Sequence, residues 1–420
     1  MKILLLGGGL SNLLAAKTLA KENYELILLE QDSILGGLAS SFKIKNHWIP
    51  KTYHHVLSNE YLMRTLIKEQ GFGEKLLWND SAICFWFNNK LFRLTSPLDI
   101  LFFKPLSWKS RIDLIKIGLI SYFKKDWKKL KTKNASEWLS KIVGEEVKKK
   151  LFEPLANIKF GSLSSVSAAW FGARLHEAAI NKEKYAYLEG GFQQLIEKIA
   201  DFIKQKGGKI YLNATVKKIV GKKVYVNIKG KQKIFEADKI ISSIPPPELV
   251  KIAKLSKEKK ELLEKIKYQP MICLVCGSKQ LLTKYYWNIF IEPKYSFGGI
   301  FHHTALYPKG GPDGEYVYYF FKYLSENDEL YKKSELEIKN VFLKDAKKIE
   351  PSFEMLWTKV FKIKNSSPVF SFDYENMPIK FTDNIYLTGI YKEYPNTRTM
   401  NSAAKSGIKT ANYVLKEQKI

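Results

Sequence analysis

The chain opens with KILLLGGGLSNLLAAKTLA over residues 2–20, and this run indicates the fold class. An apolar segment over residues 2–6 ends at three consecutive glycines, after which apolar residues recur at helical spacing. A second apolar segment, residues 25–29, ends at Glu30. The order strand, glycine turn, helix, strand and acid is typical of the βαβ unit that binds a dinucleotide in an α/β fold.

Each part of this predicted unit has a physical role toward a dinucleotide. Gly7 permits the tight turn, and Gly9 lets the backbone come close to the pyrophosphate. The helix that begins near Leu10 directs free N–H groups and the positive end of its dipole toward that anion. Glu30 is expected to accept hydrogen bonds from a ribose. The residues of this unit predicted to bind the cofactor are Gly7, Gly9, Leu10, Ser11, Glu30 and Gln31.

One position departs from the G-x-G-x-x-G pattern. Asn12 stands where the third glycine usually lets a helix pack closely on its strand. Two alternative interpretations are an accidental glycine turn and a secretory signal peptide. The signal peptide is disfavoured, because three glycines break the apolar segment and no small-residue cleavage site follows an unbroken core. The strand, the helix and the spaced acid together favour a nucleotide site over an accidental turn.

A second glycine motif, GGLASS, occupies residues 36–41, shortly after Glu30. With the first motif it resembles the FAD-dependent superfamily of amine oxidases, protoporphyrinogen oxidases and phytoene desaturases, with UDP-galactopyranose mutases as more distant relatives. The resemblance implies that Gly37, Leu38 and Ala39 lie along the diphosphate and flavin side of FAD. Many members carry Arg or Asn where this chain has Leu38.

Two further segments extend the resemblance along the chain. YLEGGF, residues 187–192, resembles the return of the chain to the FAD domain, and the resemblance implies that Val216 then meets the adenine. The predicted strand ending at Gly389 and the helix after Arg398 resemble the C-terminal FAD segment, although Ile390 replaces the usual Asp. The resemblance thus adds to the expected FAD contacts Val216, Gly389, Thr399 and Met400.

The resemblance also implies a domain organisation. The expected fold is α/β, with a Rossmann-like FAD-binding domain of the GR2 type and an interleaved substrate domain of antiparallel sheet plus helical cap. Residues 1–75, 185–250 and 365–420 are assigned to the FAD-binding domain. Residues 76–184 and 251–364 are assigned to the substrate-binding domain.

Local patterns predict several further elements. Residues 83–94 read as a β-hairpin whose turn is Asn88-Asn89. Residues 265–325 are rich in strands that are expected to form the antiparallel sheet, and residues 335–348 form a polar-faced helix. Pro245-Pro246-Pro247 is expected to force the chain out of regular structure.

Three cysteines and a histidine pair are candidates for a metal site or for the substrate pocket. Cys273 and Cys276 form a C-x-x-C pair in a predicted buried strand, where their side chains point to opposite faces. The third cysteine is Cys84, so no second pair follows; zinc is disfavoured and buried core thiols are expected. His302-His303 either lines the substrate pocket or lies at a turn, and the turn is favoured.

Residues 97–180 are predicted to be helical, aromatic and rich in lysine. Within them, Ile112–Lys131 combines an apolar helix with Tyr122, Phe123, Trp127 and neighbouring lysines. Such a helix can lie in a membrane interface. The alternative, which the sequence favours, is a helical cap over the active site whose lysines are merely solvated. The two interpretations are compatible.

The net charge of +27 comes almost entirely from lysine. Nucleic-acid readers favour arginine, so this surface argues against a nucleic-acid partner. It can attract an anionic membrane surface or an anionic substrate, or it simply reflects a lysine-biased proteome. Nothing implies an oxidising compartment, so the expected location is cytoplasmic, with peripheral attachment at the inner membrane face under the membrane interpretation; the oligomeric state stays open. The five arginines are Arg64, Arg93, Arg111, Arg174 and Arg398.

The chemistry is expected to come from FAD, so a conventional catalytic set is not needed. No Ser-His-Asp arrangement and no clustered metal ligands stand out in the sequence. Under the resemblance, Tyr53-His54-His55, Arg174 and the loop Tyr391–Arg398 converge on the flavin, while the alternative for His54-His55 is a packed or exposed structural feature. Arg174 then pairs with a substrate carboxylate or phosphate, or with an internal acid such as Glu177. The predicted catalytic residues are His55, Arg174 and Tyr391.

Three functional classes remain at this point. The first is an oxidoreductase that removes hydride from a hydrophobic isoprenoid, tetrapyrrole or amine, favoured by the aromatic content of 14% and the apolar cap. The second is a non-redox sugar-nucleotide mutase, which needs cations for a diphosphate. The third is a flavoprotein that binds a partner without catalysis. The first is our principal hypothesis.

Overall fold

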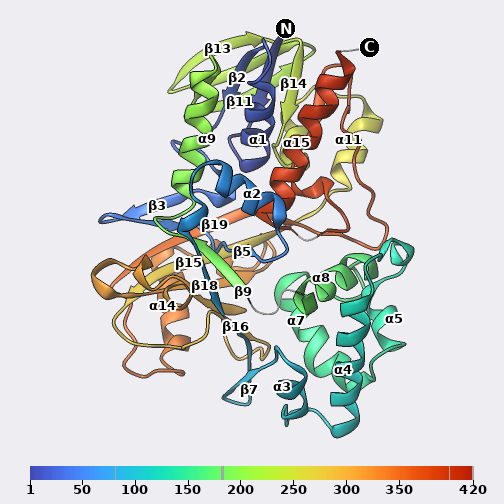
Figure 1. Ribbon diagram of the computed structural model, residues 1–420, viewed down its shortest axis with the longest axis vertical. Coiled ribbons are helices and arrows are strands. Elements are labelled where there is room, and N and C mark those ends of the chain that lie inside the picture. Colours follow the sequence, from blue (N-terminus) through green and yellow to red (C-terminus); the bar gives the residue numbers. More distant parts are fainter. Residues whose placement is uncertain (81, 181–183, 397, 419–420) are drawn as a thin grey trace.

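The computed structural model describes residues 1–80, 82–180, 184–396 and 398–418. In Figure 1 both ends of the chain lie at one end of the molecule, beside a sheet flanked by helices. The opposite end of the picture holds a second sheet on one side and a group of helices on the other. The predicted nucleotide unit and the predicted substrate elements thus occupy different parts of the molecule.

The first sheet has five parallel strands in the order β10-β2-β1-β14-β20. Its central strand β1 is buried from residue 3 to residue 6, as expected for a parallel sheet covered on both faces. The predicted βαβ unit is therefore confirmed. That unit consists of β1 (Lys2–Leu6), α1 (Leu10–Leu19) and β2 (Glu25–Leu29). The other strands of the sheet and the helices beside it are α9 (Gln193–Gln205), β10 (Lys209–Tyr211), β14 (Lys239–Ser242), β20 (Ile385–Leu387) and α15 (Met400–Glu417).

The side chain at position 12 is accommodated by hydrogen bonds. Asn12 Nδ2 donates to the Leu6 carbonyl at 2.7 Å and to the Gly7 carbonyl at 2.9 Å, which ties α1 to the end of β1. A close helix approach is made by a glycine elsewhere, in α15. A Cβ added to Gly407 would lie 1.9 Å from the Ser11 carbonyl oxygen. The missing third glycine therefore leaves the unit intact.

The second sheet has seven strands in the order β19-β15-β18-β17-β16-β7-β8. Neighbouring strands are antiparallel, as predicted, except β16 and β7, which run parallel. This pair joins segments that are distant in the chain, so no short turn dictates its direction. The predicted hairpin β7–β8 is confirmed, with φ of 49° and 58° at Asn88 and Asn89. The strands are β7 (Ile83–Phe87), β8 (Lys90–Arg93), β15 (Tyr268–Ser278), β16 (Trp287–Phe290), β17 (Gly299–His302), β18 (Tyr316–Tyr323) and β19 (Trp357–Pro368).

The central strands of this sheet alternate between two cores. Cys273 lies in the large core shared with the first sheet, and Cys276 lies in a smaller core under α14 (Glu335–Ala346). Both thiols and Cys84 are free and buried, which confirms the prediction of core cysteines. The two faces of the sheet are therefore distinct, and one of them is available to a site between the sheets.

The third part is the predicted helical group. Gly172 lets one of its helices, α8, pack on the buried Trp127, because an added Cβ would lie 2.1 Å from that ring. Among the described residues, no helix is long and apolar enough to cross a membrane. Its elements are α3 (Pro97–Leu101), α4 (Trp108–Phe123), α5 (Ala135–Ser140), α6 (Glu145–Val147), the π-helical η4 (Lys148–Phe152), α7 (Glu153–Lys159) and α8 (Ala168–Ile180).

The remaining elements are short sheets and connecting helices. The strands are β3 (Ser41–Ile44), β4 (His47–Pro50), β5 (Val56–Leu57), β6 (Leu76–Asp80), β9 (Lys184–Leu188), β11 (Ala214–Val220), β12 (Lys223–Ile228) and β13 (Lys231–Glu236). The α-helices are α2 (Tyr61–Glu69), α10 (Pro246–Ile252), α11 (Lys257–Glu264), α12 (His303–Leu306) and α13 (Glu329–Lys332).

One local expectation is wrong and another is confirmed. Pro245–Pro247 does not force the chain out of regular structure, because helix α10 begins at Pro246. The first turn of a helix leaves its N–H groups unpaired, so proline costs nothing there. His302 and His303 lie at a strand-to-helix turn, as favoured, and both are buried.

The predicted domain ranges are consistent with where the strands fall. All strands of the first sheet lie within residues 1–75, 185–250 and 365–420. The second sheet lies within residues 76–184 and 251–364, except that β19 runs on to Pro368. The boundaries themselves stay a prediction.

Candidate functional site

A cavity of about 1070 Å³ is lined by residues of both large sheets and of the helical group. Ligand pockets typically enclose about 300–1,000 Å³, so this one has room for a large cofactor and a substrate. It brings together every site residue predicted from the sequence. These residues are Gly7, Gly9, Leu10, Ser11, Glu30, Gln31, Gly37, Leu38, Ala39, His55, Arg174, Val216, Gly389, Tyr391, Thr399 and Met400.

Two glycine turns form a cradle at one end of this cavity. The Gly36 N–H donates to the Gly8 carbonyl at 2.9 Å, and a Cβ on Gly37 would lie 3.2 Å from the Gly9 Cα. A Cβ on Gly9 itself would meet no atom within 4 Å, so the backbone here borders open space. Helix α1 begins at this point without a side-chain cap and without an acid in its first turn. The cradle therefore fits the diphosphate of a dinucleotide.

Glu30 lies beside this cradle and is 7% exposed. Its Oε1 accepts a hydrogen bond from the Asp32 N–H at 2.8 Å, and its Oε2 accepts one from the Gly8 N–H. Burial raises the pKa of the Glu30 carboxyl. A carboxylate has about four acceptor positions, so two remain for ribose hydroxyls. The residue thus both braces the glycine turn and offers acceptors to the cavity.

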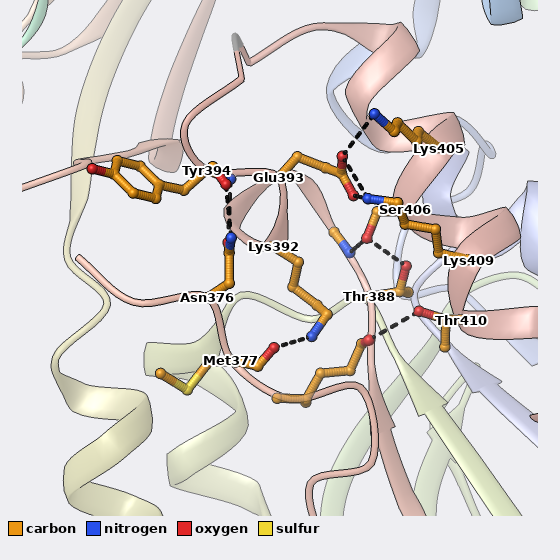
Figure 2. Close-up of polar contacts among 12 residues, drawn as sticks. Asn376, Met377, Thr388, Lys392, Glu393, Tyr394, Lys405, Ser406, Lys409 and Thr410 are labelled. Carbon is orange, nitrogen blue, oxygen red and sulfur yellow. Dashed lines mark hydrogen bonds and ion pairs between the residues drawn. The ribbon is translucent and has the colours of Figure 1, made fainter. Parts of the chain in front are cut away.

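Figure 2 shows how the C-terminal loop is held against α15. The Ser406 hydroxyl accepts a hydrogen bond from the Gly389 N–H at 3.0 Å and bonds the Thr388 hydroxyl at 3.1 Å. Farther along the loop, the buried Glu393 pairs with Lys409 at 2.9 Å and with Lys405 at 3.9 Å. These contacts fix the segment that brings Gly389 to the cavity.

The same loop is tied on its other side to residues 376 and 377, as Figure 2 also shows. Asn376 Nδ2 donates to the Tyr394 carbonyl at 2.7 Å, and Lys392 Nζ donates to the Met377 carbonyl. Burial lowers the pKa of Lys392 to about 7. The loop is therefore braced from two directions before it reaches Thr399 and Met400.

Aromatic side chains line another part of the cavity, which is called its aromatic end below. Tyr53 stacks on Phe301 with ring centroids 3.8 Å apart, and its hydroxyl lies 3.1 Å from that of Tyr323. His55 Nδ1 lies 2.9 Å from the Tyr286 hydroxyl. Burial, helped by nearby cations, lowers the pKa of His55 to about 3, so the ring is neutral near pH 7. This part of the cavity therefore presents aromatic rings and a neutral imidazole.

The other two predicted catalytic residues differ in setting. Arg174 Nη1 lies 2.6 Å from Glu177 Oε2, so the internal acid considered from the sequence is a partner of this guanidinium. Tyr391 is 1% exposed, and burial raises the pKa of its phenol. Little of its side chain reaches the cavity. The catalytic roles of these residues stay predictions.

Several cavity residues were missed from the sequence. Lys159, Glu60, Trp287 and Tyr323 all line the site. The alternation along β18 predicts that Tyr323 shares a face with Tyr319 and Phe321. The others carried no local signal, because they reach the site only through the packing of distant elements.

Comparisons with known proteins agree with this geometry. A family model described as flavin containing amine oxidoreductase matches residues 10–415. The 15-cis-phytoene desaturase of Glycine max is 26% identical over 242 residues, which cover 52% of this chain and 42% of that protein. The chain therefore matches less than half the length of this curated relative.

Solved structures share the fold over nearly the whole chain. A protein from Exiguobacterium sp. 255-15, provisionally assigned as a protoporphyrinogen oxidase, has a TM-score of 0.77 at 18% identity and covers 99% of each chain. Reduced UDP-galactopyranose mutase has a TM-score of 0.78 at 15% identity and covers 99% of this chain and 96% of that one. At these identities the likeness shows the fold alone.

Proposed function

Because this chain belongs to the family of flavin containing amine oxidoreductases, we propose that it removes hydride from a hydrophobic small molecule, such as an isoprenoid, tetrapyrrole or amine. The family makes it an FAD-dependent oxidoreductase. One observation carries the proposal: a single cavity joins the glycine cradle to the aromatic wall. Bound FAD supplies the hydride acceptor, and the chain supplies binding, orientation and shielding.

The cavity residues support these separate roles of cofactor and protein. The glycine turns and Glu30 are placed to hold a dinucleotide, while Tyr53, stacked on the buried Phe301, and Trp287 border the cavity with aromatic rings. Aromatic rings beside the flavin would limit the access of water to a hydride transfer. The mutase alternative rests on a likeness of fold alone, so we do not favour it.

The proposal is tested by flavin reduction without oxygen. Holoprotein is mixed anaerobically with candidate substrates, and the visible flavin absorbance is followed with time. Loss of that absorbance with oxidation of the substrate supports the proposal. Sugar-nucleotide exchange that requires flavin reduced beforehand, without net oxidation, would instead indicate a mutase.

His55→Phe is expected to slow flavin reduction about 10-fold or more. The substitution keeps an aromatic ring against Tyr185 but removes the hydrogen bond between His55 Nδ1 and the Tyr286 hydroxyl. The site thereby loses the imidazole proposed to face the substrate. FAD content should not change, because His55 lies away from the glycine cradle. Rapid-mixing kinetics measure the rate. His303→Phe, a buried histidine outside the cavity, is the control, and equal rates in both variants would remove His55 from the site.

We also propose that the helical group binds an anionic membrane surface. Seven large apolar side chains on or beside α3 and α4 are exposed, and Phe102 and Phe123 are 73% and 74% exposed. Lysines lie among them in the same segments, so a negatively charged lipid surface complements the patch in both polarity and charge. The apolar patch consists of Leu98, Phe102, Trp108, Ile112, Leu119, Tyr122 and Phe123.

The double variant Phe102→Ser, Phe123→Ser is expected to lose most of the binding to anionic liposomes. The change removes the two most exposed phenylalanines of the apolar patch and leaves the net charge of the protein unchanged. Co-sedimentation at low and high salt measures the effect, and binding by the unaltered protein should fall with salt because the attraction of lysine is screened within about 10 Å. Leu336→Ser, at a leucine on α14 that is 65% exposed, is the matched control. No binding by the unaltered protein at low salt would contradict the proposal.

A further inference from the structure

Among the described residues, seven cationic side chains line the cavity, and three of them, from separate segments, contact the rings of Trp287 or Trp170. Lys159 ends α7, Arg174 lies in α8, and Arg398 lies just before α15. Each is only partly exposed, unlike the many lysines at the surface. The packing of distant elements therefore gathers positive charge at the aromatic end of the cavity.

Aromatic rings hold these cations close to one another. Lys159 Nζ lies 3.8 Å from the centroid of the Trp287 ring, and the Arg174 guanidinium lies 6.0 Å from the same ring. The Arg398 guanidinium lies 4.6 Å from the centroid of Trp170. Cation–π contacts of this kind orient a cation but leave its charge uncompensated.

The cluster has more positive than negative charge. Arg174 is paired with Glu177 at 2.6 Å, and Arg398 donates to the Pro368 carbonyl at 2.8 Å. Among the described residues, no carboxylate lies within ion-pair distance of Lys159 or Arg398. The nearby acid Glu60 does not balance them fully, because burial raises its pKa to about 7.

Such an arrangement is unfavourable without an anion. Burial, followed by the charges of Arg174 and Arg398, lowers the pKa of Lys159 well below its usual range. Burial likewise lowers the pKa of Arg398 to about 10. Groups with strongly perturbed pKa values cluster at functional sites, so this gathering of cations in a cavity points to an anionic ligand.

We infer that the substrate carries an oxyanion, a carboxylate or a phosphate, which binds Lys159, Arg174 and Arg398 while its apolar body lies on the aromatic wall. This inference rests on the proposed oxidoreductase function and narrows its substrate class. A substrate whose only charge is an amine would add a fourth cation to the cluster. A neutral hydrocarbon would leave Lys159 and Arg398 without an anionic partner among the described residues, since only Arg174 has one in Glu177.

The test is the binding of matched probes to oxidised holoprotein. Dodecanoate, dodecyl phosphate, methyl dodecanoate and dodecylamine are each titrated below their micelle concentrations, and the change in flavin absorbance gives a dissociation constant. We expect an anion to bind about 10- to 100-fold more tightly than the ester or the amine. The better of the two anions distinguishes carboxylate from phosphate recognition. Equal binding of the ester or amine, or no binding of either anion, would overturn the inference.

Lys159→Met separates a binding role from a structural one. Anion binding should weaken about 10-fold, while ester binding stays the same and the melting temperature rises, because an unpaired cation has been removed. Lys260→Met, on the exposed face of α11, is the matched control and should change neither. A lower melting temperature with unchanged anion binding would make Lys159 a structural residue. These titrations involve no turnover, so they fail independently of the proposed function, which is judged by flavin reduction.

Discussion

Gly407→Ala is expected to destabilise the protein by about 3 kcal/mol. The methyl group would lie 1.9 Å from the backbone carbonyl oxygen of Ser11, and neither α1 nor α15 has a flexible side chain there that can move aside. The two helices must separate, which displaces Thr399 and Met400 from the cavity. The free energy of unfolding from urea titration measures the loss, and FAD content should fall with it.

Gly118→Ala is the matched control, since Gly118 also lies within a helix. Its added Cβ would meet nothing within 4 Å. Replacing a helical glycine by alanine then stabilises the helix by about 0.5–1 kcal/mol. Equal free energies of unfolding in the two variants would show that the α1–α15 crossing is looser than described.

Glu30→Ala is expected to weaken FAD binding about 100-fold. The change removes the carboxylate proposed to accept from the ribose, and it also leaves the N–H groups of Gly8 and Asp32 without their acceptor. The variant therefore loses both the hydrogen bonds that hold the glycine turn and the carboxylate proposed to bind the ribose. Flavin fluorescence during titration of apoprotein gives the dissociation constant.

Asp32→Asn is the control for this prediction. Asp32 follows two residues later and lines the same cavity, but its carboxylate is exposed and pairs loosely with Lys51 at 3.6 Å. The affinity of the Asp32→Asn variant for FAD should stay within about 3-fold of that of the unaltered protein, because an exposed ion pair contributes little free energy. If both variants bound FAD equally well, Glu30 would not be the ribose ligand.

The nucleotide half of the molecule was largely predictable because its signals are local. Glycines, an apolar run and an acid at fixed spacing determine a turn, a buried strand and a ligand within residues 2–30. The motif near Gly389 adds a segment that is remote in the sequence. Helix α15, which follows this motif, packs closely on α1 only because residue 407 is a glycine. That requirement becomes visible only when the two helices are seen to cross.

The substrate half was predictable in its elements but not in its assembly. Helices and strands followed from periodicity, yet the parallel pairing of β16 with β7 joins segments about 200 residues apart, and no pattern in either strand indicates it. Lys159 is one lysine among many in the sequence. Only the packing of α7 against the second sheet places it over Trp287. The three prolines at 245–247 are compatible with a helix because α10 begins at Pro246, where no N–H donor is needed.

The central claim is that this chain oxidises an apolar substrate by passing hydride to FAD. The most direct measurement is a single anaerobic turnover with the candidate substrate classes: an isoprenoid phosphate, a tetrapyrrole carboxylate and a hydrophobic amine. We expect at least one to abolish the visible flavin absorbance and to give a product that has lost two hydrogen atoms. A flavin that stays oxidised while these compounds bind, or a product of unchanged mass, would contradict the account.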